Sequence, residues 1–351
     1  MDVSFVLPLC LKEFGSDGFA TKQSESYKNI VDRLLLSIDK FGNVDVIADI
    51  FVICPDDEMQ EIQENLKKHQ NYDTLTFVSE DSLVPDAMKI KAYDPDGRGG
   101  WYFQQVLKIA CATLVKTDFY ITLDSDVILM KPMQVAQLFS GERSFVNVED
   151  KAYYQKMYTE EFAEEEYMVK TGRYLRAVEV LELEETERSS VQIFGETPVT
   201  LNKHISNALI AHMSALSDTP WYELLMRQSG WTEYGLYFMF AQKTNLLDKY
   251  HVVASPDHVL DLSRSAWHLS SHYIVPRNYD HAHFFGNASE NGGLFLVIQS
   301  WISEEDWLPE QFASKHEFYA TLLTWLDIDS KEIVPEVEPL IEDASASELE
   351  L

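Results

Sequence analysis

Two aspartates one residue apart stand at the end of an apolar run, and together they could hold a divalent cation. Asp124 and Asp126 follow residues 119–123, whose aromatic and β-branched side chains are typical of a buried strand. If the strand continues through the pair, both carboxylates point to one face and Ser125 points to the other. Carboxylate oxygens suit Mg²⁺ or Mn²⁺, ions that commonly bridge to substrate phosphates. The alternative is a pair of turn or helix-capping aspartates.

The elements that must position this pair alternate between strand and helix. Short apolar runs predict strands, and apolar residues at helical spacing predict helices. In chain order, these strands and helices are residues 3–9, 27–41, 48–54, 58–69, 75–78, 101–114 and 119–123. Such alternation implies an α/β fold with an open, mostly parallel sheet flanked by helices, in which ligands bind beyond the carboxyl ends of the strands. Pro8 and the Asp124/Asp126 pair fall at such ends.

Composition limits the classes of partner. The chain of 351 residues is 46% hydrophobic and carries a formal net charge of −30, which argues against general affinity for nucleic acid or anionic membranes. Three cysteines without C-x-x-C spacing indicate neither a disulfide framework nor a zinc site. The acidic N-terminus makes a poor signal peptide, and no run of about 18 apolar residues occurs. We expect a cytoplasmic protein without a transmembrane segment.

The chain divides into two halves of one domain and a tail. Residues 1–148 contain the alternating strands and helices, whereas residues 149–328 combine a Glu-rich helical stretch with densely spaced aromatic residues. The Glu-rich stretch is interpreted chiefly as a solvated helical face. Residues 329–351 are acidic, contain prolines and lack an apolar period, so we expect this tail to be disordered.

The segment GWYFQQVLKIACATLVKTDFYITLDSDVILMKP, residues 100–132, resembles the central block of GT-A-fold glycosyltransferases. It is most similar to a bacterial branch catalogued as a domain of unknown function, with a similar Gly-Trp-Tyr-x-Gln-Gln helix. VSFVLPL at the N-terminus, WTEYGLY at 231–237 and VIQSW at 297–301 also match. The resemblance implies a Rossmann-like GT-A sheet, with nucleotide-sugar binding in residues 1–148 and an aromatic-rich α+β acceptor-side half in residues 149–328.

The resemblance also implies donor-binding residues. In GT-A enzymes the first strand and its loop contact the base and ribose, the acidic motif holds ribose and metal, and the helix before the motif often faces the donor. Lys108 on that helix could oppose a phosphate charge. The corresponding donor-side residues here are Pro8, Leu9, Gln104, Gln105, Lys108, Asp124 and Ser125, with Asp124 and Asp126 as metal ligands.

A downstream histidine often completes the metal site of GT-A enzymes. The candidates in this chain are His258, His268, His272, His281 and His283. In an extended DHAHFF segment, His281 and His283 would share one face, so His283 is the preferred metal ligand and His281 an acceptor-side candidate. His204, in NKHIS, is a further acceptor-side candidate.

Glu233 in WTEYGLY is the candidate acid or base. Its aromatic neighbours Trp231 and Tyr234 could raise the pKa of the carboxyl and present flat faces to an acceptor sugar. The alternative is a structural Glu beside aromatic residues that only pack.

These residues favour a Mn²⁺- or Mg²⁺-dependent glycosyltransferase. The donor is a nucleoside-diphosphate sugar, with UDP favoured, and the acceptor is a hydroxyl of a glycan or other molecule, as in polysaccharide biosynthesis. One alternative is a nucleotidyltransferase, but its expected Gly-rich basic loop is weak here, since residues 8–22 contain only Lys12 and Lys22 as basic residues. The other is a non-catalytic sugar or nucleotide-sugar binding protein of the same fold.

Overall fold

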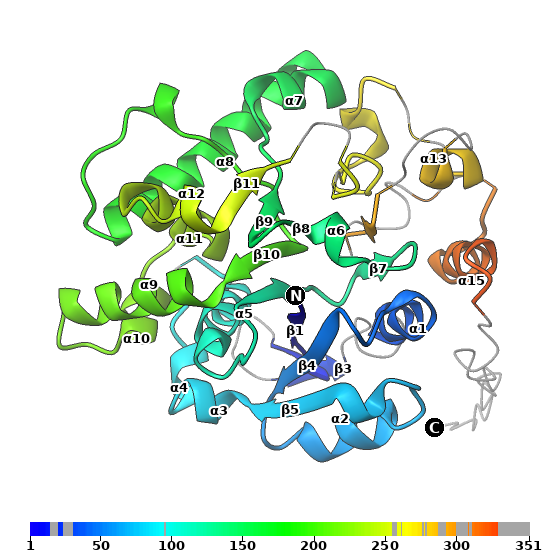
Figure 1. The fold of residues 1–351 in the computed structure, drawn as a ribbon, viewed down its shortest axis with the longest axis horizontal. Helices are drawn as coiled ribbons and strands as arrows, with labels where there is room; N and C mark the ends of the chain where they lie inside the picture. The colour runs from blue at the N-terminus through cyan, green and yellow to red at the C-terminus, as the bar shows by residue number, and fades with distance from the viewer. Residues whose placement is uncertain are drawn as a thin grey trace, which may run out of the picture.

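The computed structural model describes residues 1–14, 20–23, 31–94, 96–254, 258–260, 262–275, 277, 279–286, 293–299, 308 and 311–328. Its central sheet has the strand order β10-β6-β1-β4-β5 (Figure 1). These strands are β1 (Val3–Pro8), β4 (Ile47–Cys54), β5 (Leu75–Ser79), β6 (Phe119–Thr122) and β10 (Val199–Asn202). All neighbouring pairs are parallel except β10 with β6.

Side chains of the central strands alternate between two helical layers. Val3, Phe5 and Leu7 of β1 pack in one core with α1 (Asp32–Phe41) and α2 (Met59–Leu66). Val6 points the other way, into a core that includes residues of α5, α9 and α11. Figure 1 shows α1 on one side of the sheet, with α5 and α9 on the other. The helices of this second layer are α5 (Gly99–Ala110), α9 (Lys203–Leu216) and α11 (Glu233–Lys243).

Smaller sheets and helices surround this centre. Within the described part of the chain there are three further small sheets, β11-β9-β8, β12-β7 and β2-β3. The remaining strands are β2 (Lys12–Phe14), β3 (Ala20–Gln23), β7 (Val127–Leu129), β8 (Phe139–Ser140), β9 (Arg143–Val146), β11 (His251–Val253) and β12 (Phe295–Val297). The remaining α-helices are α3 (Glu80–Leu83), α4 (Ala87–Lys91), α6 (Val135–Leu138), α7 (Lys151–Met157), α8 (Glu160–Val180), α10 (Trp221–Met226), α12 (Leu247–Tyr250), α13 (His281–Phe285) and α15 (Lys315–Trp325).

The predicted α/β fold with a mostly parallel sheet flanked by helices is confirmed. Each predicted strand and helix of the first 123 residues is present, although residues 27–30 of the first predicted helix lie outside the described residues. One local prediction is wrong. The chain leaves β6 at Thr122, and Asp124 and Asp126 occupy a turn before β7, so strand alternation does not orient them. The tail, residues 329–351, lies outside the described residues.

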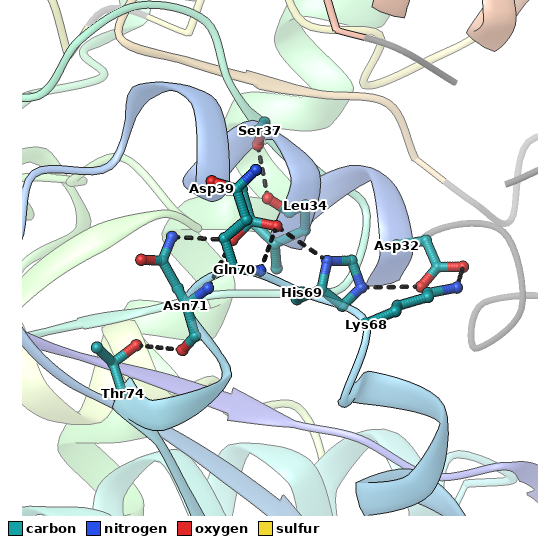
Figure 2. Close-up of polar contacts among 9 residues, drawn as sticks. All are labelled: Asp32, Leu34, Ser37, Asp39, Lys68, His69, Gln70, Asn71 and Thr74. Atoms are coloured by element: carbon teal, nitrogen blue, oxygen red, sulfur yellow. Dashed lines mark hydrogen bonds and ion pairs between the residues drawn. The ribbon is translucent and has the colours of Figure 1, made fainter. Parts of the chain in front are cut away.

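A buried histidine fastens α1 to the segment that leads from α2 to β5 (Figure 2). The His69 ring contacts Asp39 through Nδ1 at 3.2 Å and Asp32 through Nε2 at 3.1 Å. Lys68 Nζ donates to Asp32 at 2.7 Å, and the Asn71 amide donates to Asp39 at 2.9 Å. These contacts fix the edge of the sheet remote from β10 against the helix that covers β1.

Candidate active site

A cavity of about 440 Å³ lies beyond the carboxyl end of β6. Its walls come from the N-terminal part of α5, the turn after β6, the start of α11, and α7 and α8. The lining residues are Arg98, Trp101, Gln104, Gln105, Lys108, Asp124, Glu149, Tyr153, Tyr154, Tyr158, Glu166, Lys170, Arg173, Glu196, Thr197, Thr232, Glu233, Tyr234, Trp267, His268 and Gln299. Six of the predicted site residues therefore meet in one cavity: Gln104, Gln105, Lys108, Asp124, Glu233 and Tyr234.

Lys108 joins two carboxylates at the base of this cavity. Its Nζ donates to Asp124 Oδ1 at 2.6 Å and to Glu233 Oε1 at 3.1 Å, and its side chain is only 2% exposed. Burial alone would lower the pKa of Lys108, but the two carboxylates raise it well above the usual value. The ammonium is charged and already balanced by the protein. The expected contact of Lys108 with a substrate phosphate stays a prediction; in this structure its Nζ contacts Asp124 and Glu233.

The Gly-Trp-Tyr-x-Gln-Gln segment explains how α5 positions the site. Gln104 lies one turn before Lys108 and donates from Nε2 to Asp124 Oδ1 at 3.4 Å. Gln105 accepts a hydrogen bond from the backbone N–H of Glu233 at 2.9 Å. Tyr102 accepts one from the N–H of Gly230 at 2.7 Å. The helix therefore holds both the turn after β6 and the segment that starts α11.

Glu233 is the first residue of α11, and its side chain is 2% exposed. Burial raises the pKa of this carboxyl, and Lys108 opposes that rise. The direction of the shift is the predicted one, but its cause is burial and not contact with Trp231. The indole of Trp231 is fully buried and donates to the carbonyl of Leu225, so Trp231 is a core residue outside the cavity lining.

A second charged cluster lines the same cavity. Lys170 and Arg173 of α8 both contact Glu196, which also lines the cavity. Burial would raise the pKa of Glu196, but these two cations lower it to about 2. Glu149 accepts a hydrogen bond from Tyr154 at 2.6 Å, and burial raises its pKa to about 7. The cavity thus contains a carboxylate that is always ionised beside one that titrates near neutral pH.

Aromatic rings and a neutral imidazole complete the lining. The Trp101 ring lies between two guanidinium groups, 4.9 Å from that of Arg98 and 5.9 Å from that of Arg173. His268 packs edge-to-face against Tyr158, with ring centroids 5.3 Å apart. Burial, with help from the charge of Lys170, lowers the pKa of His268 to about 3. The His268 ring is therefore neutral at pH 7, a form that can both donate and accept a hydrogen bond.

The residues of the turn after β6 fit a divalent cation through Asp124. Among the described residues, both hydrogen bonds to this carboxylate go to Oδ1, and the side chain is 27% exposed. One carboxylate is enough where waters and substrate phosphates supply the other ligands of Mg²⁺. Asp126 is 8% exposed, is not among the lining residues, and lies close enough to Tyr319 to contribute to the raised pKa of that phenol. Within the described ranges, no three His, Cys, Asp or Glu side chains form a metal-binding group.

Three predicted donor contacts lie outside the cavity lining. Leu9 is buried in the core shared with α1, and its N–H donates to the carbonyl of Ile53 at 2.8 Å. Pro8 and Ser125 are half-buried and do not line the cavity. The signals for these residues were the resemblance to GT-A enzymes and proximity in sequence to the end of β1 or to the aspartate pair.

The predicted acceptor-side histidine His204 lies at the wrong edge of the sheet. It follows β10, which runs antiparallel to β6 and pairs Asn202 with Phe119, the first residue of β6. His204 is therefore at the amino end of β6, where it contacts Asp118 at 3.4 Å. The sequence did not reveal the reversed direction of β10.

DHAHFF is helical and not extended, which changes the positions of His281 and His283. The segment forms α13, capped by Asp280, whose carboxylate accepts the N–H of His283 at 2.8 Å. His283 Nε2 lies 3.0 Å from the carbonyl oxygen of Arg264, and the His281 ring stacks on Phe285. Neither lines the cavity; of the five histidines considered, all within the described residues, His268 does.

Several lining residues were not predicted. They are Arg98, Trp101, Glu149, Tyr153, Tyr154, Tyr158, Glu166, Lys170, Arg173, Glu196, Thr197, Thr232, Trp267 and Gln299. Half of them belong to the Glu-rich stretch that was interpreted as a solvated face. The available signal was the pair Lys170 and Arg173, two cations three residues apart within an acidic helix. Such a pair shares one helix face and can gather carboxylates.

Comparison with known proteins places the chain in a family. Residues 1–323 match the model of a family of unknown function, DUF6492. The chain belongs to this family. That confirms the predicted membership of a domain family of unknown function. No curated protein matches the sequence.

Solved structures of three glycosyltransferases show loose likeness to this DUF6492 chain. Mouse xyloside xylosyltransferase 1 is 10% identical, with 73% of this chain and 86% of that chain covered and a TM-score of 0.39. GlyE of Streptococcus pneumoniae TIGR4 is 12% identical, with 95% and 62% covered and a TM-score of 0.38. The PaToxG glycosyltransferase is 13% identical, with 71% and 72% covered and a TM-score of 0.33. Similarity at this level does not assign an activity.

One further property concerns membranes. Among the described residues, no helix combines the length and the apolar character needed to cross a bilayer.

Proposed function

We propose that this protein is a glycosyltransferase that uses a nucleoside-diphosphate sugar, with UDP as the favoured nucleotide. The main supporting observation is the Asp124–Lys108–Glu233 cluster, which lies at the base of a cavity beyond the carboxyl end of β6. Ligands of open α/β sheets bind at this edge. The resemblance of residues 100–132 to the GT-A central block supports the same assignment.

The reaction requires a charged leaving group and a base. The acceptor oxygen forms a bond to the anomeric carbon, the bond from that carbon to the phosphate oxygen breaks, and the nucleoside diphosphate leaves. Mn²⁺ or Mg²⁺ held by Asp124, with Asp126 as the second predicted ligand, would neutralise the diphosphate when bound. Arg98, Lys170 and Arg173 are the cavity-lining cations other than Lys108.

Glu233 is the proposed base in an inverting reaction. It lines the cavity, and burial raises its pKa toward the range in which a carboxylate accepts a proton effectively. Lys108, 3.1 Å away, keeps the carboxylate oriented and favours its ionised form before reaction. The acceptor hydroxyl would transfer its proton to Glu233 as the new glycosidic bond forms.

The acceptor side of the cavity suits a neutral, hydroxyl-rich molecule. Glu149, Glu166 and Glu196 line the cavity with Lys170 and Arg173, so a hydroxyl group can donate to a carboxylate and accept from a cation. The rings of Trp101, Tyr153, Tyr158 and Trp267 offer flat faces to the C–H surface of a sugar. These residues support a glycan or another hydroxyl acceptor.

The deciding experiment is titration calorimetry with a panel of nucleotide sugars, with and without Mn²⁺, followed by assay of donor hydrolysis. We expect the unmodified protein to bind a donor only with the metal and Asp124→Asn to bind at least tenfold more weakly. Asp73→Asn is the matched control, because Asp73 is exposed just before β5, at the opposite edge of the sheet. Absence of binding to every donor would refute the proposal, and binding without turnover on any acceptor would favour a sugar-binding protein.

A further inference from the structure

A second cavity, of about 510 Å³, lies against the wall of the first. Its sides come from β6, β9, β10, β11, β12, α7 and the segment after β11 that contains Leu260 and Leu262. Its volume is within the range of cavities that bind organic ligands.

The two cavities adjoin. Glu149, Tyr153 and Glu196 line both of them. One ligand can therefore have a polar part in the first cavity and another part in the second. The shared wall is the Glu149/Glu196 side of the first cavity, which is the side that we assign to the acceptor.

The chemistry of the second cavity is mainly aliphatic. Val146, Val148, Val199, Leu260 and Leu262 all contribute to it. Its ionisable lining residues are three acids, Glu149, Asp150 and Glu196, against one base, Lys156. A nucleotide phosphate would meet an excess of negative charge there, whereas an uncharged apolar group would be favourably removed from water.

We propose that the second cavity binds an alkyl chain carried by the acceptor. The inference rests on the proposed glycosyltransferase function and deepens it, because it defines the acceptor as an amphipathic molecule. Its hydroxyl-bearing end lies between Glu233 and Glu149 in the first cavity, and its alkyl chain lies along β10 between Val199 and Leu262. The alkyl chain then leaves the second cavity near Ala152 and Val253, two lining residues that are solvent-exposed.

The test measures binding without donor, metal or turnover. The neutral fluorescent probe N-phenyl-1-naphthylamine is bound to the full-length protein and displaced by n-alkanols from butanol to decanol. We expect displacement to strengthen with chain length by up to about fourfold for each methylene, because each buried methylene contributes a similar hydrophobic increment. n-Alkyl glucosides of the same chain lengths should follow the same trend.

Two substitutions locate the binding. Ala152→Phe on α7 and Ala254→Phe after β11 each place a ring in the second cavity, and each should weaken alkanol binding at least tenfold. Ala215→Phe on α9 is the matched control, because Ala215 is exposed on a helix that covers the opposite side of the sheet. If one cavity variant fails to fold, the other still tests the site.

The outcomes separate this proposal from the proposed function. Absence of probe binding, affinity independent of alkyl length, or equal affinity in Ala254→Phe and Ala215→Phe would overturn the alkyl site. None of these results would affect metal-dependent donor binding, which is measured separately. Conversely, the protein could bind no nucleotide sugar and still bind longer alkanols more tightly. The second cavity would then remain an alkyl-binding site, and its link to a glycosyl acceptor would be withdrawn.

Discussion

At the scale of single residues, Lys108 is the group that organises the candidate site. It is the link between the turn after β6 and the start of α11, because its Nζ contacts Asp124 and Glu233 together. A cation at this position lets two carboxylates approach one another without both becoming protonated. The shared ammonium therefore explains why a buried Glu can start α11 at the base of a cavity.

Substitution of Lys108 should be strongly destabilising. Lys108→Met keeps the aliphatic stem but leaves Glu233 buried without its counter-charge, and loss of one partner of a buried pair costs about 3–5 kcal/mol. The double variant Lys108→Met/Glu233→Gln should lose clearly less than the sum of the single losses, since the uncompensated charge is gone. Urea unfolding of the four proteins measures this coupling. Additive losses would show that the contact contributes no interaction energy.

Substitution of Glu233 should separate binding from catalysis. Glu233→Gln preserves size and the ability to accept from Lys108, but it removes the proton acceptor. We expect kcat for sugar transfer to fall about a hundredfold or more, the usual effect of losing a general base, with donor affinity changed little. Steady-state kinetics on the identified acceptor test this, with donor calorimetry alongside. Unchanged kcat would withdraw the catalytic role of Glu233.

At the scale of elements, the His69 cluster determines how α1 is attached to the sheet. Asp32 and Asp39 are both on α1, one on each side of the His69 ring (Figure 2). Burial would lower the pKa of His69, but hydrogen bonds to these two carboxylates raise it. Burial would raise the pKa of each aspartate, but the His69 contacts lower both. Charged imidazolium and charged carboxylates therefore stabilise one another.

This attachment should weaken on both sides of mildly acidic pH. Because the pKa of His69 is raised in the folded state, its contribution to the unfolding free energy is complete below pH about 6.5. This contribution is lost as the pH rises through the folded-state pKa. Because the pKa values of Asp32 and Asp39 are lowered in the folded state, their contribution to the unfolding free energy is complete above pH about 4. This contribution is lost as the pH falls through their folded-state pKa values. We expect the unfolding free energy of the native protein to decrease from pH 6 to pH 9 more than that of His69→Gln. Parallel profiles from urea unfolding would contradict this assignment.

At the scale of the whole molecule, the net charge of −30 should make stability depend on ionic strength. The chain has 58 Asp and Glu against 28 Lys and Arg, so the folded state carries unscreened self-repulsion at low salt. The screening length falls from about 30 Å at 0.01 M salt to about 10 Å at 0.1 M. We expect Tm to rise over this range, equally in NaCl and tetramethylammonium chloride, as measured by calorimetry. A falling Tm would mean that ion pairs outweigh the repulsion.

The order of strands and helices was predictable because it depends on local pattern. Residues 119–123 read as a buried strand from their composition alone, and Trp101, Gln104 and Lys108 fall on a predicted helix immediately before it. In an open α/β sheet the helix before a strand runs antiparallel to it, so the start of that helix lies at the carboxyl end of the strand. Asp124 was identified from this order, whereas Lys108 was identified from the resemblance to GT-A enzymes and Glu233 from its aromatic neighbours.

The rest of the site could not be predicted, because it depends on direction and burial across long sequence separations. The antiparallel course of β10 moved His204 to the opposite edge, and the helical form of α13 turned His281 and His283 away from the cavity. Lys170 and Arg173 belong to an acidic helix that looked solvated, yet they face Glu196 inside the cavity. The spacing of Lys170 and Arg173 was a local signal, but no local pattern identifies Glu196 as their partner or gives the direction of β10.

By itself, the sequence determined the α/β alternation, the position of the acidic turn and the strongly negative charge, since each follows from composition or from spacing within one element. Only the tertiary structure decided that Lys108 balances two carboxylates, that His268 is the histidine of the cavity, and that an aliphatic cavity adjoins it. The physical reason is that pairing and desolvation are properties of groups brought together from distant parts of the chain.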